Sequence, residues 1–305
     1  MLEQIAVIGA GMMGKMIAFV FSSHYDVIVY DIQAMDLVAD IRDTTKDLVA
    51  GGLLSATELE RRLSRIRFTP DMNDDLISGA DLVIEAVFED MELKRKTFAE
   101  LEQICRADCI LCSNTSVMSP TEISRDLDHR ERFAVTHFWN PAHLIPLVEV
   151  VMSDATSSDI AQTIMYTLTG VGKKPILCKK DVPGFVANRL QHALWREAIY
   201  MVENGIADPR TVDDACKYGP GLRWPILGPM ENSDLVGIDL TYNIHDYLLK
   251  SLADNHAPSY MLREMLDRGD LGVKTLKGWQ EWTPEQVEDI NAGLREYLIS
   301  KLKKN

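Results

Sequence analysis

The chain has 305 residues, of which 46% are hydrophobic and 26% charged, and its formal net charge at pH 7 is −14. This length predicts two domains, each large enough for its own core. Nucleic acid and anionic membranes would repel so acidic a surface, so we expect neither as a partner. The sequence contains no apolar run near the ~20 residues of a membrane span and no basic leader, so we expect a cytoplasmic protein.

The opening stretch has the pattern of a dinucleotide-binding βαβ unit. A β-branched strand is followed by Gly9, Gly11 and Gly14 in the spacing G-x-G-x-x-G, then by a helical pattern and a second strand that ends in Asp31. The first glycine permits a tight turn, the second lets the backbone approach a pyrophosphate, and the third lets the helix pack closely on the strand. A glycine-rich turn can also serve packing alone, but the complete order of elements favours a nucleotide site.

The same stretch indicates which nucleotide binds. The helix begins at Met12 and Met13, and its first turn offers free N–H groups and a positive dipole end to phosphates. Asp31 can accept both ribose hydroxyls and would repel a 2′-phosphate, while Ile32 and Gln33 supply no arginine to hold one. We therefore expect NAD rather than NADP. FAD uses the same glycine pattern, so this stretch alone does not fix the chemistry.

The middle of the chain alternates strands with helices. A pair of charged helices is predicted over 35–67, with a break at Gly51-Gly52 and a capping box from Ser55 to Glu58. Such alternation predicts an α/β fold with a Rossmann-type, doubly wound and mostly parallel sheet. Further strands are expected at 67–69, 80–87, 109–112, 132–139, 147–152 and 174–180, and helices at 90–106 and 157–169.

After Pro183-Gly184 the strand patterns stop. Helical patterns follow at 185–204, 209–217, 233–252, 259–268 and 284–303. We therefore expect two domains. Residues 1–182 would form an NAD-binding domain with the helix pair inserted at 35–67, and residues 183–305 an all-helical domain for substrate binding and dimerisation.

Three of the five cysteines have a spacing that can hold an iron–sulfur cluster. Cys105, Cys109 and Cys112 form C-x3-C-x2-C, but the last two lie in a predicted strand, where successive side chains point to opposite faces. We expect buried free thiols and no metal. The cysteines also give no disulfide framework, as is usual in a reducing compartment.

A histidine and a glutamate are the best candidates for catalysis. His137 ends one predicted strand, and Glu149 lies among apolar residues in the next. A glutamate in such a setting is expensive to bury unless it is paired. Paired with His137, it would orient the imidazole, which could then remove an alcohol proton as a general base. The spacing alone leaves a purely structural His–Glu pair equally open.

These residues belong to a longer resemblance. The segment HFWNPAHLIPLVEV resembles the signature of the 3-hydroxyacyl-CoA dehydrogenase family, H-F-F-N-P followed by L-V-E-V. The preceding SNTS, the following DVPGFVANRL and the opening glycine motif match the same family in the same order, over nearly the whole chain. The resemblance implies NAD-dependent oxidation of a 3-hydroxyl to a 3-oxo group, with His137 as the base and Glu149 holding it.

The resemblance also implies roles for residues that look ordinary by themselves. In the family pattern, Ser116 of N-T-S and Asn188 of P-G-F-x-x-N-R touch the substrate oxygen; otherwise they would read as a helix cap and a solvated side chain. Four more residues would join the cofactor site, of which the first two would otherwise read as a solvated helix start: Glu89 and Lys94 in EDMELK, Asn140 after the histidine segment, and Lys274 in GVKTLKGW.

One segment departs from the acyl-CoA members of the family. YGPGLRW and LGPME, in the predicted helical domain, are more similar to the lambda-crystallin and L-gulonate 3-dehydrogenase branch, whose members oxidise a free hydroxy acid. Arg223 within it could clamp a substrate carboxylate by two parallel hydrogen bonds. A salt bridge from Arg223 to Glu231 or Asp234 is the alternative.

The helix pair favours the other substrate class. In the acyl-CoA enzymes that the chain resembles, this insertion contacts CoA. Its basic residues could meet phosphates, or they could form a solvated face because acids are interleaved with them. They are Arg42, Lys46, Arg61, Arg62 and Arg65.

The sequence therefore predicts an NAD-dependent dehydrogenase acting on a small-molecule substrate, as a homodimer. A 3-hydroxyacyl-CoA such as 3-hydroxybutyryl-CoA is the first substrate class by family resemblance, and a free 3-hydroxy acid held by Arg223 is the alternative. A non-catalytic NAD-binding structural protein is a remote third, since a packing role needs none of His137, Glu149, Ser116 and Asn188.

Overall fold

The computed structural model describes residues 2–303, and the chain divides into two compact units. Unit 1 holds the described residues up to Ala187 together with those from Ala292 onward, and unit 2 holds Asn188–Asn291. The sequence places the division at 182/183 and assigns everything beyond it to the second domain. The residues from Ala292 onward instead group with unit 1, because the end of the last helix packs there.

Unit 1 is built on one sheet of eight strands in the order β3-β2-β1-β4-β5-β6-β7-β8. The strands from β3 to β6 in this order are parallel, β7 is antiparallel to β6, and β8 is parallel to β7. The predicted Rossmann-type, mostly parallel sheet is confirmed. The strands are β1 Gln4–Ile8, β2 Asp26–Tyr30, β3 Ile66–Thr69, β4 Leu82–Glu85, β5 Ile110–Ser113, β6 Phe133–Phe138, β7 Leu147–Met152 and β8 Lys174–Cys178.

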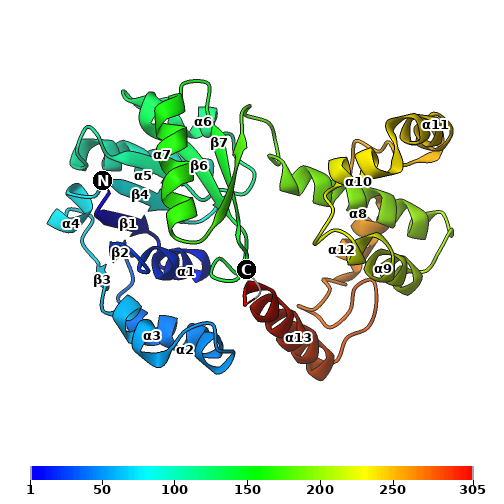
Figure 1. Ribbon diagram of the computed structural model, residues 1–305, viewed down its shortest axis with the longest axis horizontal. Helices are drawn as coiled ribbons and strands as arrows, with labels where there is room; N and C mark the ends of the chain where they lie inside the picture. The colour runs from blue at the N-terminus through cyan, green and yellow to red at the C-terminus, as the bar shows by residue number, and fades with distance from the viewer. Residues whose placement is uncertain (1, 304–305) are drawn as a thin grey trace. The chain divides into compact units, whose positions relative to one another are not determined.

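Helices cover both faces of this sheet (Figure 1). In β1, Ile5 and Val7 join one apolar cluster and Ala6 and Ile8 the other, because successive side chains of a strand point to opposite faces. The sequence did not predict α4 and α6, which are too short for a helical period to show. One face carries α1 Met12–Phe21, α2 Leu37–Ala50, α3 Ala56–Leu63 and α7 Ser158–Gly170; the other carries α4 Asp75–Ser78, α5 Met91–Ile104 and α6 Pro120–Ser124.

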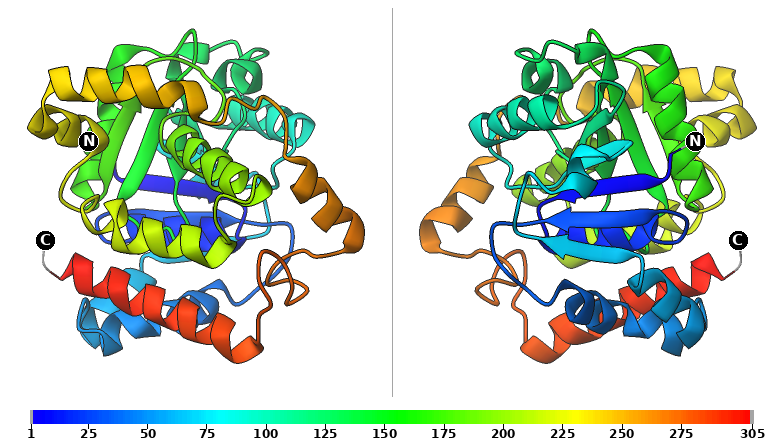
Figure 2. Two further views of the ribbon diagram at one scale, coloured as in Figure 1. Left: turned by 90° about the vertical axis from the view of Figure 1, so that its right-hand side faces the viewer. Right: turned by 90° about the vertical axis from the view of Figure 1, so that its left-hand side faces the viewer.

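The α2–α3 hairpin (residues 37–63) packs against the end of α13 Pro284–Leu302 (Figure 2). Ile299 of α13 joins the same apolar cluster as Leu48, and a side chain at Gly51 would come within 2.7 Å of Ile299. Arg295 pairs with Asp47 at 2.5 Å. This contact explains why the last residues belong to unit 1.

The predicted cap of α3 is present, but the reciprocal half of the capping box is different. The Ser55 hydroxyl accepts the backbone N–H of Glu58 at 3.1 Å, as expected. The Glu58 carboxylate accepts instead from Arg61 and Arg62. Two arginines offer stronger, charge-assisted hydrogen bonds than a single backbone N–H.

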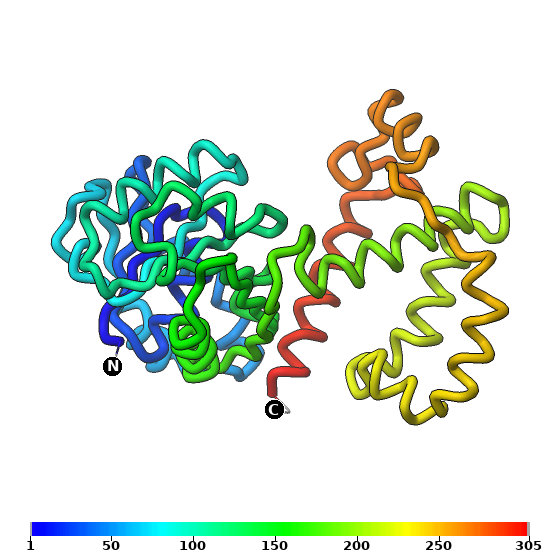
Figure 3. The backbone as a smooth tube through the Cα atoms, turned by 90° about the horizontal axis from the view of Figure 1, so that it is seen from above, coloured from blue at the N-terminus to red at the C-terminus, as the bar shows by residue number. Residues whose placement is uncertain are grey.

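Unit 2 is helical, as expected, and Figure 3 traces it from α8 in light green to α12 in orange. Among its described residues, the β-structure is limited to isolated bridges at Gly272–Lys277 and Lys277–Glu281. The single helix predicted over 233–252 is wrong, because Gly237 has a φ of 102° and ends one helix before the next begins. The helices are α8 Ala187–Glu203, α9 Pro209–Tyr218, α10 Pro229–Val236, α11 Ile238–Leu248 and α12 Tyr260–Arg268; short 3-10 turns lie at Arg130–Arg132, Pro220–Leu222 and Leu249–Ser251.

Residues 2–303 include all five cysteines and every helix of the structure. All five cysteines are free, and burial raises the pKa of Cys112 to about 12. Over that range, no cluster of three or more His, Cys, Asp or Glu side chains is arranged to hold a metal ion. No helix there combines the length and apolar composition needed to cross a membrane.

Candidate active site

The glycine turn has the geometry that its motif predicts. Gly9 has a φ of 102°, and a side chain on it would lie 2.7 Å from the carbonyl oxygen of Ala86. A side chain at Gly14 would lie 1.8 Å from the carbonyl oxygen of Gly9. A side chain at Gly11 would meet no described atom within 4 Å. Packing therefore requires the first and third glycines, and the second borders open space where a pyrophosphate can approach.

Asp31 lies directly after β2 and is tied to this turn. Its Oδ2 accepts the backbone N–H of Ala10 at 2.8 Å, and its Oδ1 accepts that of Gln33 at 3.0 Å. Met12 opens α1 with its side chain largely exposed, whereas Met13 packs against the core. Together, these features fit the phosphates and a ribose of NAD beside the carboxyl end of β1 and β2.

His137 and Glu149 form the pair that the sequence predicts. They face each other across the antiparallel β6 and β7, and His137 Nδ1 lies 2.9 Å from Glu149 Oε2. Both are buried, with relative exposures of 5% and 0%. Because Nδ1 is engaged by the carboxylate, Nε2 is the imidazole nitrogen left to take up a proton.

Glu149 is held by more than His137. Its Oε2 also accepts the indole N–H of Trp139 at 3.2 Å, and its Oε1 accepts the backbone N–H groups of Val186 and Ala187, each at 2.9 Å. Burial would raise the pKa of Glu149, but the hydrogen bonds from His137, Ala187, Val186 and Trp139 outweigh it and hold the pKa below its ordinary value. The carboxylate is therefore charged and fixed.

A second polar network lies at the ends of β4 and β5. The backbone N–H of Ser116 donates to Glu89 Oε1 at 2.9 Å, and the Thr115 hydroxyl donates to the same oxygen. Lys94 Nζ lies 3.3 Å from Glu89 Oε2 and 2.7 Å from Glu85 Oε1. The structure thus brings together Ser116, Glu89 and Lys94, which the family resemblance assigns to substrate and cofactor, and adds Glu85.

The two acids of this network differ in exposure and in pKa. Glu85 is fully buried, and burial raises its pKa against the opposing effects of Lys94, Ser113 and the N–H of Val87. Glu89 is 39% exposed, and burial raises its pKa less than Thr115, Lys94 and Ser116 lower it. Glu89 is thus the exposed, charged end of the network.

Sequence reasoning missed Glu85 and Trp139. Each had a weak signal: Glu85 is the one acid in the apolar run LVIEAV, and Trp139 lies two residues beyond His137. The backbone donors of Val186 and Ala187 had none, because any residue can supply an N–H.

The remaining predicted residues are distributed over both units. Asn140 is exposed just beyond the carboxyl end of β6, in unit 1. Asn188 near the start of α8, Arg223 after the turn Pro220–Leu222, and Lys274 between α12 and α13 lie in unit 2. The roles of these four residues stay predictions.

Arg223 does not form the salt bridge that the sequence left open. Its side chain is exposed, and no acidic side chain in residues 2–303 pairs with it. The carboxylate of Glu231 instead accepts the backbone N–H of Gly228 at 2.8 Å. The guanidinium of Arg223 therefore has no ion pair among the described residues.

The basic residues of the hairpin and its flank are in the opposite situation. Five of the six between 35 and 67 pair with an acid of the same chain, Arg67 being the exception, and the exposed Arg42–Glu60 pair lies at 2.8 Å. The acids interleaved with these basic residues therefore act as their partners. The other pairs are Lys46–Asp43, Arg61–Glu58, Arg62–Glu58 and Arg65–Asp26.

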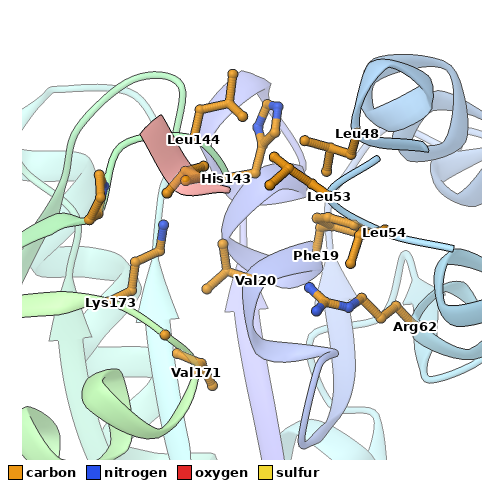
Figure 4. A pocket seen from close by; sticks show the side chains of 13 residues that line it. Phe19, Val20, Leu48, Leu53, Leu54, Arg62, His143, Leu144, Val171 and Lys173 are labelled. Atoms are coloured by element: carbon orange, nitrogen blue, oxygen red, sulfur yellow. The ribbon is translucent and has the colours of Figure 1, made fainter. Parts of the chain in front are cut away.

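A pocket of about 150 Å³ lies between α1, the hairpin and the loop that joins β6 to β7 (Figure 4). His143 and Lys173 line it beside Phe19 and Val20, and so does Arg62, one of the basic residues considered for CoA phosphates. Burial lowers the pKa of His143 to about 4, and its buried Nδ1 has no partner among the described residues. Lys173 Nζ donates to the carbonyl groups of Ala142 and Ile145.

A Rossmann-type sheet with this glycine turn, an acid at the tip of β2 and a buried His–Glu pair defines an NAD-dependent dehydrogenase. Comparison with known families agrees. Residues 4–182 match the NAD binding domain of 3-hydroxyacyl-CoA dehydrogenase, and residues 184–282 match the C-terminal domain of the same family. The chain therefore belongs to the 3-hydroxyacyl-CoA dehydrogenase family and is an oxidoreductase that uses NAD.

Similar proteins within the family differ in substrate. The chain is 32% identical over 306 residues to 5-formyl-3-hydroxy-2-methylpyridine 4-carboxylate 5-dehydrogenase of Mesorhizobium japonicum, covering 98% of this chain and 97% of the relative. It is 35% identical over 285 residues to a probable 3-hydroxybutyryl-CoA dehydrogenase of Deinococcus radiodurans, covering 90% and 99%.

A solved structure is also similar to this chain. A crystal structure of 5-formyl-3-hydroxy-2-methylpyridine 4-carboxylic acid 5-dehydrogenase, described as an NAD+-dependent dismutase, superposes with a TM-score of 0.89 at 32% identity, covering 98% of this chain and 97% of the other.

Proposed function

We propose that the protein oxidises the hydroxyl group of a small hydroxy acid with a free carboxylate, using NAD, and that Arg223 binds the carboxylate. The observation that carries this proposal is the exposed guanidinium of Arg223, which pairs with no acid in residues 2–303. An unpaired arginine offers a carboxylate two parallel hydrogen bonds, whereas a thioester has no matching group. This order of substrate classes reverses the expectation from family resemblance.

The hairpin supports the same choice. CoA carries phosphates, and a chain that binds them needs available cations. Five of the six basic residues between 35 and 67 are already paired with acids of the chain, and the exposed Arg67 is the exception among the described residues. The Mesorhizobium relative, which the chain matches nearly from end to end, is likewise named for a carboxylate.

A 3-hydroxyacyl-CoA such as 3-hydroxybutyryl-CoA is the second candidate. The family and the Deinococcus relative favour it. The two candidates share one site and one reaction and differ in what the protein recognises next to the carbon that carries the hydroxyl.

The residues of the chain have distinct roles in the proposed reaction. Glu149 holds His137 with Nε2 facing outward, and Nε2 takes the hydroxyl proton as the alcohol becomes a ketone. Ser116 and Asn188 hydrogen-bond to the reacting oxygen. Bound NAD supplies the hydride acceptor. In the reverse direction, protonated His137 returns the proton to the oxygen, and Glu149 stabilises the imidazolium until then.

The glycine turn and the acid after β2 carry the proposed cofactor site. The open space beside Gly11 and the fixed carboxylate of Asp31 are the observations that fit it. The residues assigned to it are Gly9, Gly11, Met12, Met13, Gly14, Asp31, Glu89, Lys94, Asn140 and Lys274.

We also propose that the protein is a homodimer through its helical unit. Several large apolar side chains of that unit are exposed, including Ile226 at 81% and Tyr247 at 86%. Exposed apolar surface of this kind favours association. Light scattering coupled to gel filtration should give a mass near twice 34.3 kDa; a monomer would contradict the proposal.

The substrate proposal is tested by following NADH formation with the purified protein. Free hydroxy acids, such as 3-hydroxybutyrate and L-gulonate, are compared with 3-hydroxybutyryl-CoA. We expect turnover of a free acid. Turnover of the thioester alone would establish the second candidate, and NADH binding without turnover of any compound would favour the non-catalytic alternative.

Arg223→Met tests the specificity residue. Loss of a charge-assisted, two-pronged contact should raise KM for the free acid about 100-fold and change kcat little. Arg210→Met, at another exposed arginine of unit 2, is the matched control and should leave KM unchanged. An unchanged KM in Arg223→Met would remove Arg223 from the proposal.

A further inference from the structure

Glu85 and Lys94 form an ion pair that is almost completely buried. Their side chains are 0% and 1% exposed, and Glu85 Oε1 lies 2.7 Å from Lys94 Nζ. Desolvating two charges costs several kcal/mol, and an apolar pair of similar size is often as stable. Fold stability alone therefore gives little reason for this pair.

We propose that Glu85 is a positioning residue, which fixes Lys94 so that Lys94 orients Glu89 toward the cofactor and the Ser116 loop. Glu85 lies at the last position of β4, and Lys94 lies in the first turns of α5. The inference rests on the proposed function, because that proposal assigns Glu89 and Lys94 to NAD and Ser116 to the substrate.

Both oxygens of Glu85 are fully used, which makes it a rigid anchor. Oε1 accepts from Lys94 and from the backbone N–H of Val87 at 2.7 Å, and Oε2 accepts from the Ser113 hydroxyl at 2.6 Å. Lys94 lies in α5, Ser113 ends β5, and Val87 lies in the loop just after β4, so three separate segments hold the carboxylate in place.

From this anchor the contacts run outward to the exposed end of the network. Lys94 lies between Glu85 and Glu89, at 2.7 and 3.3 Å from their carboxylate oxygens. Glu89 accepts the N–H of Ser116 with its other oxygen. A ligand that contacts Glu89 therefore meets a carboxylate whose direction depends on Lys94, and through Lys94 on Glu85.

The test is a double-mutant cycle with NADH binding as the readout, measured by fluorescence or calorimetry on the full chain without hydroxy acid. Glu85→Gln keeps the shape of the side chain and removes its charge, and we expect the Kd for NADH to rise about tenfold. Lys94→Met should raise it at least as much. The double variant should match Lys94→Met, because Glu85 acts only through Lys94.

Another buried ion pair of unit 1 supplies the control. Glu102 pairs with Arg132 at 3.7 Å, and Arg132 lies just before β6, at the opposite end of the strand from His137. Glu102→Gln should lower Tm and leave the NADH Kd within about twofold, as expected of a purely structural pair.

Three results would overturn the proposal: a wild-type NADH Kd in Glu85→Gln, a wild-type Kd in Lys94→Met, or additive effects of the two. If Glu85→Gln does not fold, Lys94→Met and the neutral double variant still decide the question, because a tighter or weaker Kd in the double variant gives Glu85 a role apart from Lys94. A wild-type protein that binds NADH but turns over no hydroxy acid contradicts the proposed function and leaves this test intact.

Discussion

Unit 1 pairs its charges in two ways, and the contrast separates function from surface chemistry. At the sheet edge where the parallel strands have their carboxyl ends, Glu85 and Lys94 are almost completely removed from water, and so are Glu149 and His137. In the hairpin, Arg42 and Glu60 pair at 2.8 Å with half of each side chain exposed. The ion-pair distances are therefore similar, but one set of pairs is buried and the other is exposed to water.

The exposure of an ion pair determines how much it contributes to stability. Exposed pairs are screened by solvent and contribute little to stability, but they occupy the cations that a phosphate would need. Buried pairs cost desolvation and become strongly destabilising when one partner is removed. We therefore expect large and specific effects at the strand ends and small ones in the hairpin.

The largest effect is expected from replacing His137, the proposed base of the buried pair. His137→Gln keeps a polar side chain but cannot accept the hydroxyl proton as imidazole does, so kcat should fall about 1,000-fold. NADH affinity should stay within a few-fold, because His137 is not assigned to the cofactor. A steady-state assay and an NADH titration measure the two quantities; equal losses in both would point to misfolding.

The glycine turn gives the next largest effect. Alanine at Gly14 would place a carbon 1.8 Å from the Gly9 carbonyl oxygen, and the required backbone shift should lower the free energy of unfolding by about 3 kcal/mol. Gly11→Ala meets open space, so it should retain stability and lose NADH affinity. Denaturation with and without NADH compares them; equal stability losses would contradict this description of the turn.

His143, which lines the pocket beside the hairpin, should make the stability of the protein depend on pH. In the folded protein its pKa is about 4, below the ordinary 6.5, so the unfolded chain takes up the proton first as the pH falls. The stability that this group contributes is therefore fully present above pH 6.5 and is lost as the pH falls toward 4, by about 3 kcal/mol.

His143→Phe should flatten this acid limb of the stability curve. Urea unfolding at several pH values measures it. A variant that loses as much stability as the wild type between pH 6.5 and 4 would exclude His143 as the cause.

The smallest effect is expected in the hairpin. Arg42→Ala removes an exposed ion pair and should change Tm by no more than about 1–2 °C, with less change in high salt. Calorimetry measures the shift. A large loss would mean that the hairpin pairs resemble the buried ones after all.

The fold was predictable because its signals are local. The G-x-G-x-x-G turn and the alternation of strands with helices are each written within a few tens of residues. The wrong predictions of helices also have local causes. The helix expected over 233–252 is interrupted because Gly237 adopts a φ that only glycine adopts readily, and α4 and α6 were missed because they span barely one turn.

The site was predictable only in part because its supporting contacts are distant in sequence. The pairing of His137 with Glu149 follows from neighbouring strands, and the structure places them 2.9 Å apart. The N–H groups of Val186 and Ala187, 37 and 38 residues beyond Glu149, follow from no pattern of residue types. The burial of Glu85 depends likewise on how α5 packs against β4.

The contact between α13 and the hairpin constrains the order in which parts of the chain can fold during synthesis. Arg295 and Asp47 are separated by 248 positions, so the ribosome must add all the intervening residues before this face of the hairpin is covered. Until then, Leu48 lacks its neighbour Ile299 and exposes apolar surface. Such a late, long-range contact slows the completion of a fold and leaves its intermediates prone to aggregate. Unit 1, although its first strand is made early, can be completed only after unit 2 has been synthesised.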